Sequence, residues 1–259
     1  MKSDDGIEPS SFSRRAHSLT IVNDLRCRLP PKFRAFMLVV FLVLFERTDA
    51  GAQQIEQFWP EIDTYLKVDH RFRFLFNAST TQEAGSDVGS QFGANLDIFT
   101  KPLLKLKRFT VFQLDEAKSR PLALRFGYAY LPTPGKQPEN RVTLDATPRF
   151  PLKAAISVAD RNRGELRVID GKSSWRYRNR LTVERSFKIR SYHFTPYVRG
   201  EAYYDSNPAK WSRTTEEIGC IFPIHRRAEI ESYYQHMNDT SKSPNRQTHG
   251  VGLTLSFYF

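Results

Sequence analysis

Residues 250–259, at the end of the chain, alternate between apolar positions and small or polar ones. Successive side chains of a β-strand point to opposite faces, so one face of a strand here would be entirely apolar. A strand of an outer-membrane barrel has this pattern, because its apolar face contacts lipid and its polar face lines a wet lumen. The apolar face consists of Val251, Leu253, Leu255, Phe257 and Phe259.

The same residues resemble the C-terminal signature of bacterial outer-membrane proteins, a terminal Phe with apolar residues at alternating positions before it. This resemblance implies that the barrel-assembly machinery recognises the five apolar residues. It also implies that outer-membrane lipid surrounds the folded chain. We therefore expect the protein in the outer membrane of a Gram-negative cell.

From Trp59 onward, strand-like segments are separated by clusters of Pro, Gly, Asn, Asp and Lys. Long polar loops, such as 132–138 and 238–247, tend to alternate with short turns, as in barrels with an even strand number. The pattern predicts an all-β fold, a single antiparallel transmembrane barrel of about 12 strands, with about ten as the alternative. The last strand is expected to close the barrel against the strand that begins near Trp59. The expected strands include those at about 175–187, 193–204, 212–222 and 227–237, and a weak one near 108–115.

An apolar run at residues 35–45 follows Lys32 and Arg34. A helix needs about 20 apolar residues to span a bilayer, so this run is too short to cross one. It matches the core of a secretory signal peptide, with residues 50–52 as a small-x-small cleavage site. We expect residues 1–52 to be an N-terminal extension and Sec-type signal peptide that is cleaved, and residues 53–259 to form the barrel. A buried core helix is the alternative interpretation of the run.

Aromatic residues are numerous, with 20 Phe, 11 Tyr and 3 Trp, which favours β structure and interfacial belts. Charged residues make up 26% of the chain, which excludes a multi-pass helical membrane protein. The formal net charge of +11 is also typical of soluble nucleic-acid binders. Because the basic residues are spread along the chain and do not form one tract, we expect no nucleic-acid partner.

Arg and Glu occupy alternate positions in three consecutive expected strands. Within residues 175–184, Trp175, Tyr177, Leu181 and Val183 fall on one face, and the charged residues fall on the other. A charge facing lipid near the membrane midplane costs about 2–4 kcal/mol, so the charged rows are expected to point inward. The predicted lumen-lining charged residues are Arg161, Arg163, Glu165, Arg167, Arg176, Arg178, Arg180, Glu184, Arg199 and Glu201.

These rows have two interpretations. In the first, Arg and Glu side chains interlock and partly fill a narrow barrel. In the second, a basic lining attracts anionic solutes by its fixed charge. Glu165, Glu184 and Glu201 neutralise part of the arginine excess, which favours the first.

Other chemistry has weak signals. His193, His225, His236 and His249 lack the spacing of metal ligands, and the sequence contains no GxSxG nucleophile motif. We therefore expect no metal, no cofactor and no catalytic residue. Six aromatic residues are expected in interfacial belts, namely Tyr203, Tyr204, Trp211, Tyr233, Tyr234 and Tyr258.

Residues from about Gln57 to Phe259 resemble a family of Gram-negative outer-membrane barrels that is known only as a domain of unknown function. The features that carry the resemblance are Trp59, the rows 161–167 and 176–184, the triplet 199–201, Phe257 and Phe259. The family has no assigned reaction, so the resemblance implies a fold and a location but no activity.

The expected function is that of a small passive outer-membrane barrel that is not an enzyme. A channel for small anionic solutes is the specific hypothesis, since arginines predominate in the expected lumen. Two alternatives stay open at this point. One is an outer-membrane phospholipase-like enzyme, and the other is a secreted soluble β protein that binds polyanions.

Overall fold

The computed structural model describes residues 53–99, 114–241 and 243–259. The expected signal peptide, with its apolar run at 35–45 and its cleavage site, lies outside the described residues. Most of the weak strand expected near 108–115 also lies outside them. No helix in the described part of the chain is long and apolar enough to cross a membrane.

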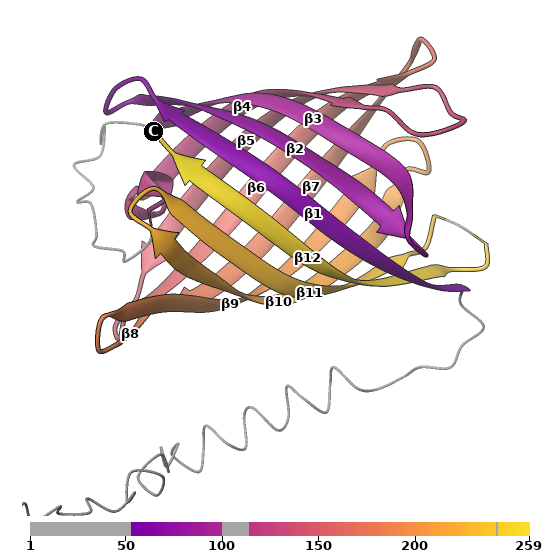
Figure 1. Cartoon of the computed structure of the whole chain (residues 1–259). Helices are drawn as coiled ribbons and strands as arrows, with labels where there is room; N and C mark the ends of the chain where they lie inside the picture. Colours follow the sequence, from indigo (N-terminus) through magenta and orange to yellow (C-terminus); the bar gives the residue numbers. More distant parts are fainter. Residues whose placement is uncertain (1–52, 100–113, 242) are drawn as a thin grey trace, which may run out of the picture. The chain divides into compact units, whose positions relative to one another are not determined.

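One closed β-sheet forms the barrel shown in Figure 1. Within the described residues, eleven strands make up the ring, and the short β8 pairs only with β9. A single turn of 3₁₀ helix, η1 (Glu116–Ser119), lies between β3 and β4. The strands are β1 (Gln53–Lys67), β2 (Phe72–Glu83), β3 (Ser86–Phe99), β4 (Leu122–Leu131), β5 (Glu139–Pro151), β6 (Ile156–Ile169), β7 (Lys172–Arg185), β8 (Phe187–Ile189), β9 (Tyr192–Asp205), β10 (Lys210–His225), β11 (Ala228–Asp239) and β12 (Arg246–Tyr258).

The last strand closes the ring against the first, with Trp59 opposite Gly252. This part of the prediction is confirmed, but the β1–β12 pair is parallel. The prediction of an antiparallel barrel with an even strand number is therefore wrong. In a ring of sequentially antiparallel strands, an odd number makes the first and last strands run in the same direction. Residues 114 and 115, at the end of the expected weak strand, form no strand.

The odd strand number places the start of β1 and the C-terminus at opposite ends of the barrel, which we call the Gln53 end and the Phe259 end. The predicted division into long loops at one end and short turns at the other is wrong. The Phe259 end carries the connections 68–71 and 152–155, which are longer than the connections 84–85 and 170–171 at the Gln53 end. Loop length therefore does not distinguish the two ends.

Apolar side chains cover the outside of the barrel, and polar side chains fill the inside. Along β7, Trp175 and Leu181 are 52% and 49% exposed, while Arg176 and Glu184 are 8% and 6% exposed. Soluble proteins rarely leave such extended apolar surface uncovered. The sheet is thus built around a polar interior.

Aromatic rings packed inside the barrel account for two glycines of β12. A Cβ atom at Gly252 would lie 1.9 Å from the Tyr233 ring, and one at Gly250 would lie 2.4 Å from the Trp59 ring. Tyr233 is also the register partner of Gly252 across the β11–β12 pair. The small residues of the final strand therefore leave room for rings from its two neighbours.

Candidate functional site

A cavity of about 570 Å³ occupies the inside of the barrel. Its lining extends from Thr81, near the Gln53 end of β2, to Asp115 and Lys118 at the other end. Pockets of about 300–1,000 Å³ accommodate small molecules in proteins. The cavity is therefore large enough for a small organic solute.

Acidic and basic side chains line this cavity in equal numbers among the described residues. The acidic ones are Glu61, Asp63, Asp97, Asp115, Asp145, Glu184, Glu217, Glu229 and Glu231. The basic ones are Lys118, Arg125, Arg141, Arg149, Arg161, Arg163, Arg178, Arg180 and Arg199. With every group ionised, the formal charge of the lining is zero.

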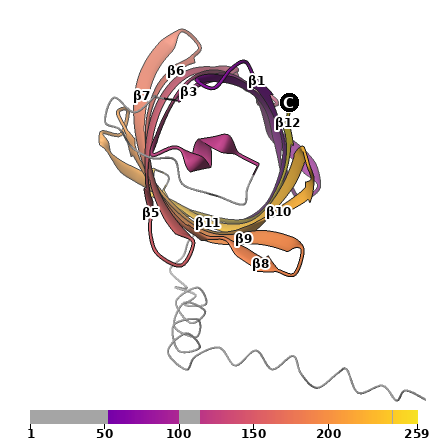
Figure 2. The ribbon, with the colours of Figure 1, turned by 90° about the vertical axis from the view of Figure 1, so that its left-hand side faces the viewer.

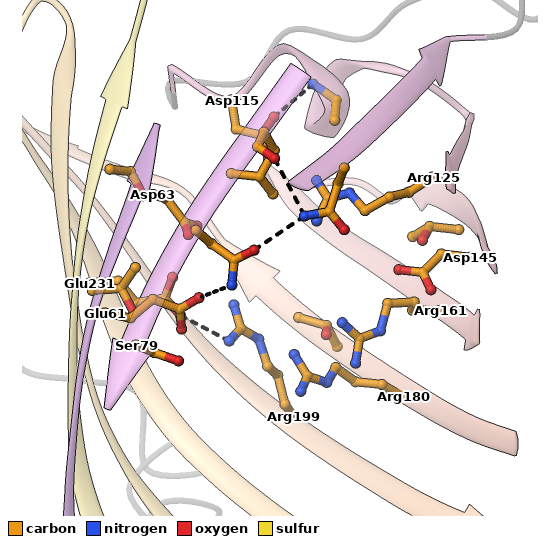
Figure 3. A pocket seen from close by; sticks show the side chains of 18 of the residues that line it. Glu61, Asp63, Ser79, Asp115, Arg125, Asp145, Arg161, Arg180, Arg199 and Glu231 are labelled. Atoms are coloured by element: carbon orange, nitrogen blue, oxygen red, sulfur yellow. Dashed lines mark hydrogen bonds and ion pairs between the residues drawn. The ribbon is translucent and has the colours of Figure 1, made fainter. Parts of the chain in front are cut away.

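Most of the basic and acidic side chains of the lining lie on different walls. An acidic wall on β1, β10 and β11 consists of Glu61, Asp63, Glu217, Glu229 and Glu231. A basic wall on β4 to β7 consists of Arg125, Arg141, Arg149, Arg161, Arg163, Arg178 and Arg180. These strands occupy opposite arcs of the ring, and Figure 3 shows Glu61 and Asp63 across the cavity from Arg161 and Arg180. Asp145 and Glu184 are exceptions, since they belong to strands of the basic wall. Arg199 of β9 pairs with Glu217 and Glu231 of the acidic wall at 2.8 and 2.9 Å. A solute inside would lie between opposite charges.

Two buried glutamates hold the basic wall together. Glu201 forms three ion pairs, at 2.8, 2.9 and 2.8 Å, with the guanidinium groups of Arg161, Arg178 and Arg180. Arg178 also pairs with Glu165 at 2.8 Å. Glu201 and Glu165 together carry two negative charges against these three guanidinium groups, so positive charge remains in excess around Glu201.

All ten charged residues predicted for the lumen lie on β6, β7 and β9. Six of them line the cavity, namely Arg161, Arg163, Arg178, Arg180, Glu184 and Arg199. The other four, Glu165, Arg167, Arg176 and Glu201, form ion pairs beside it. Arg167 pairs with Glu139 at 2.7 Å, and Arg176 pairs with Asp205 at 2.5 Å. Their role in solute passage stays a prediction.

The acidic wall was missed by the sequence reasoning, although a signal for it exists. Glu61 and Asp63 flank an isoleucine in β1, and Glu229 and Glu231 flank another in β11. This is the same alternation of charged and apolar positions that indicated the arginine rows. The alternation identifies inward carboxylates as well as inward guanidinium groups.

Residues 114–121, which we call the plug, lie inside the ring at the Phe259 end, and Figure 2 shows η1 within the opening. Asp115 pairs with Arg73 of β2 at 2.7 Å. Lys118 pairs with Glu184 of β7 at 2.9 Å. The plug is thus held from well-separated parts of the wall.

The plug backbone adds two further contacts to the wall. Arg149 of β5 donates to the carbonyl of Ala117 at 2.9 Å. The N–H of Leu114 donates to the carboxylate of Glu229 in β11 at 2.5 Å. Asp115 also caps the start of η1 by accepting from the N–H of Ala117 at 2.9 Å. These contacts hold the plug against the wall at this end of the cavity.

The charge of Asp115 depends on its cationic neighbours. Burial by itself would raise the pKa of this carboxyl group, but the guanidinium groups of Arg73 and Arg149 and the ammonium of Lys118 hold the pKa well below its usual range. Asp115 therefore stays ionised and bound to the wall at neutral pH.

Half of the predicted aromatic belt is wrong. Tyr203 is 7% exposed, and its hydroxyl donates to Glu201 inside the barrel. Tyr233 and Tyr258 line the cavity. Tyr203 is followed by Tyr204, and Tyr233 by Tyr234, so alternation along a strand allows only one ring of each pair to face outward.

The apolar residues of the last strand lie on the outer face, where Val251 and Phe259 are 53% and 59% exposed. Their recognition by the assembly machinery stays a prediction. In the residues that the structure describes, no group of three or more His, Cys, Asp or Glu side chains is arranged to hold a metal ion. His236 and His249 do lie together, with their Nδ1 atoms 3.4 Å apart, which their sequence spacing does not predict.

The family model described as "Protein of unknown function (DUF2490)" matches residues 56–248. The match runs from β1 into β12 and stops before the final aromatic residues. None of the curated proteins matches the sequence.

Proposed function

The chain belongs to the DUF2490 family of proteins of unknown function, and we propose that it is an outer-membrane β-barrel whose plugged lumen passes small polar solutes. The proposal includes export by a Sec-type signal peptide, insertion by the barrel-assembly machinery and no catalytic step. The observation that carries it is the polar cavity of about 570 Å³, which extends from near the Gln53 end to the plug.

The outer surface supports a membrane location. Phe126, Leu144 and Leu166 are 53%, 62% and 52% exposed on neighbouring strands. Removing a large apolar side chain from water is worth about 1.5–3 kcal/mol. A wall covered by such residues is stabilised by contact with lipid, and the charged side chains lie inside the barrel, away from lipid.

The lining supports weak charge selectivity. The hypothesis of a channel for anionic solutes was based on the arginines of the basic wall. The carboxylates of the acidic wall add negative charge to the same lumen. Equal numbers of fixed charges produce no large net potential along the lumen. We therefore propose that small polar solutes of either sign enter, with anions passing along the basic wall.

The plug supports a gated passage. Its polar contacts with the wall are ion pairs and hydrogen bonds, which water can replace. Its one buried apolar side chain in the described residues, Ala117, is small and packs with Phe99 and Ala123. A hydrogen bond to a charged group contributes a net of about 1.5–3 kcal/mol, and the plug can detach without breaking any strand pairing of the barrel. Detachment would open the Phe259 end.

Conductance in planar bilayers tests this function. Lys118→Met removes an ion pair whose side chains are 15% and 7% exposed, and it should raise the open probability severalfold over that of the wild type. Glu116→Gln on the same 3₁₀ turn is the matched control, because its pair with Lys67 is 46% and 41% exposed. This control should conduct like the wild type.

A folded Lys118→Met barrel that never conducts would overturn the proposed passage. Phospholipid turnover in detergent with calcium would favour the phospholipase-like alternative instead. Solubility without detergent, combined with binding to a polyanion, would favour the secreted protein.

A further inference from the structure

Two carboxyl groups on the acidic wall lack cationic partners. Glu61 and Asp63 occupy consecutive inward positions of β1, and neither forms an ion pair with any described residue. Glu61 accepts a long hydrogen bond, 3.5 Å, from Asn77. Asp63 Oδ2 accepts from Tyr65 at 3.1 Å, while its buried Oδ1 has no hydrogen-bond partner in the described chain.

Two neighbouring carboxyl groups repel each other when both are ionised, and a buried acceptor without a donor costs about 1–3 kcal/mol. A group with several N–H donors and a positive charge would relieve both penalties at Glu61 and Asp63. An ammonium group has this chemistry.

On the facing basic wall, the guanidinium groups around Arg161 have too few acceptors and too little negative charge. Arg161 donates from Nη2 to Glu201 at 2.8 Å, but its buried Nε has no acceptor among the described residues. Arg178 and Arg180 share the same glutamate, and Arg178 alone of the three also pairs with Glu165, so two negative charges face three positive ones. A carboxylate or other anionic group would satisfy Arg161 and reduce this excess.

The two carboxyl groups and Arg161 line the same cavity, and Figure 3 shows Asp63 and Arg161 on opposite sides of it. A ligand of a single sign would be attracted by one wall and repelled by the other. A ligand with a cationic and an anionic end would be attracted by both. We propose that the lumen binds small zwitterionic solutes, with the ammonium group at Glu61 and Asp63 and the anionic group at Arg161.

This inference rests on the proposed function and names the class of solute that the passage selects. Three straight-chain probes of equal carbon number test it: ε-aminocaproate, adipate and hexamethylenediamine. Isothermal titration of the detergent-solubilised full-length barrel should show ε-aminocaproate binding about tenfold or more tightly than either probe of a single sign, a difference of about 1.4 kcal/mol.

Asp63→Asn and Arg161→Gln should each weaken ε-aminocaproate binding by about tenfold. Glu216→Gln is the matched control, because it removes a carboxylate from an exposed residue outside the cavity lining, and binding should stay at the wild-type level. Heat-modifiable gel mobility verifies that each variant is folded. If Asp63→Asn does not fold, Glu61→Gln replaces it.

Equal or tighter binding of adipate or hexamethylenediamine would overturn the zwitterion site, as would no binding of any probe. Unchanged affinity in Asp63→Asn and Arg161→Gln would also overturn it. Zwitterion binding in a barrel that never conducts would contradict the passage but leave the site intact. The two failures are therefore distinguishable.

Discussion

Replacing Arg73 by Met tests how firmly the plug is attached. The Arg73 side chain is 4% exposed, and its Nε and Nη2 donate to one oxygen of Asp97 at 2.9 and 2.6 Å. Its Nη1 donates to Asp115 of the plug at 2.7 Å. The guanidinium group also lies 4.3 Å from the centre of the Tyr65 ring. Met retains the apolar stem against this ring and removes the charge.

Removing one partner of a buried ion pair costs about 3–5 kcal/mol, because the other charge stays buried. Asp97 keeps a second partner, Arg125, at 2.5 Å, and the Asp115 side chain is 15% exposed. We therefore expect the lower end of the range, a loss of about 3 kcal/mol in the free energy of unfolding.

Denaturant unfolding in detergent micelles, monitored by circular dichroism, measures this loss. Lys67→Met is the control, because it removes an exposed ion pair to the same turn and should cost about 0–1 kcal/mol. The double variant Arg73→Met/Asp115→Asn should lose less than the sum of the single variants, since it leaves no unpaired Asp115 carboxylate. A loss from Arg73→Met no larger than that of the control would refute the view that this ion pair anchors the plug.

Three further predictions concern packing, pH and assembly. Gly252→Ala should destabilise the barrel by about 1–3 kcal/mol in denaturant unfolding, because its Cβ would meet the Tyr233 ring, whereas Gly164→Ala, with open space beside it, should have little effect. Equal losses from the two substitutions would contradict the packing. Because folding lowers the pKa of Asp115, the charge of this carboxylate stabilises the fold above a pH of about 4, and the contribution falls as acid protonates it. The denaturant midpoints of the wild type and Asp115→Asn should therefore converge on acidification. A difference that stays constant with pH would refute the stabilising role of this charge. Deleting Phe259 should reduce the amount of barrel in the outer membrane more than it changes conductance, and wild-type membrane levels would count against the assembly signature.

Alternation along single strands was the most informative feature of the sequence. It anticipated a final strand with an apolar outer face, and it grouped Arg161, Arg163 and Glu165 in one row. The structure places all three on the polar inner side, with Glu165 only 2% exposed. Strand alternation needs no knowledge of distant contacts, which is why it can be identified in a single sequence.

Features that depend on distant pairing were not predictable in this way. The parallel β1–β12 pair joins the first and last strands of the ring, and whether these two strands run parallel or antiparallel depends on the total strand number. The plug has no strand or long-helix periodicity, and contacts such as Leu114 with Glu229 join residues far apart in the sequence. The inward tyrosines could have been found, since adjacent residues such as Tyr233 and Tyr234 must face opposite sides.

The charged interior changes how the arginine rows are understood. Viewed on β6 and β7 alone, they indicate a basic pore, but the carboxylates of β1, β10 and β11 balance them. Buried glutamates such as Glu201 also bind several guanidinium groups at once. Interlocking charges and a polar cavity therefore coexist in the same lumen, and the balanced lining does not support a purely basic pore.

Separation of cell envelopes tests whether this barrel resides in the outer membrane. We expect the protein to partition into the outer-membrane fraction, to need detergent for extraction and to show heat-modifiable gel mobility, because its strands form a closed ring with apolar side chains exposed on the outer face. Recovery as a soluble protein without detergent, with the same mobility before and after heating, would contradict it.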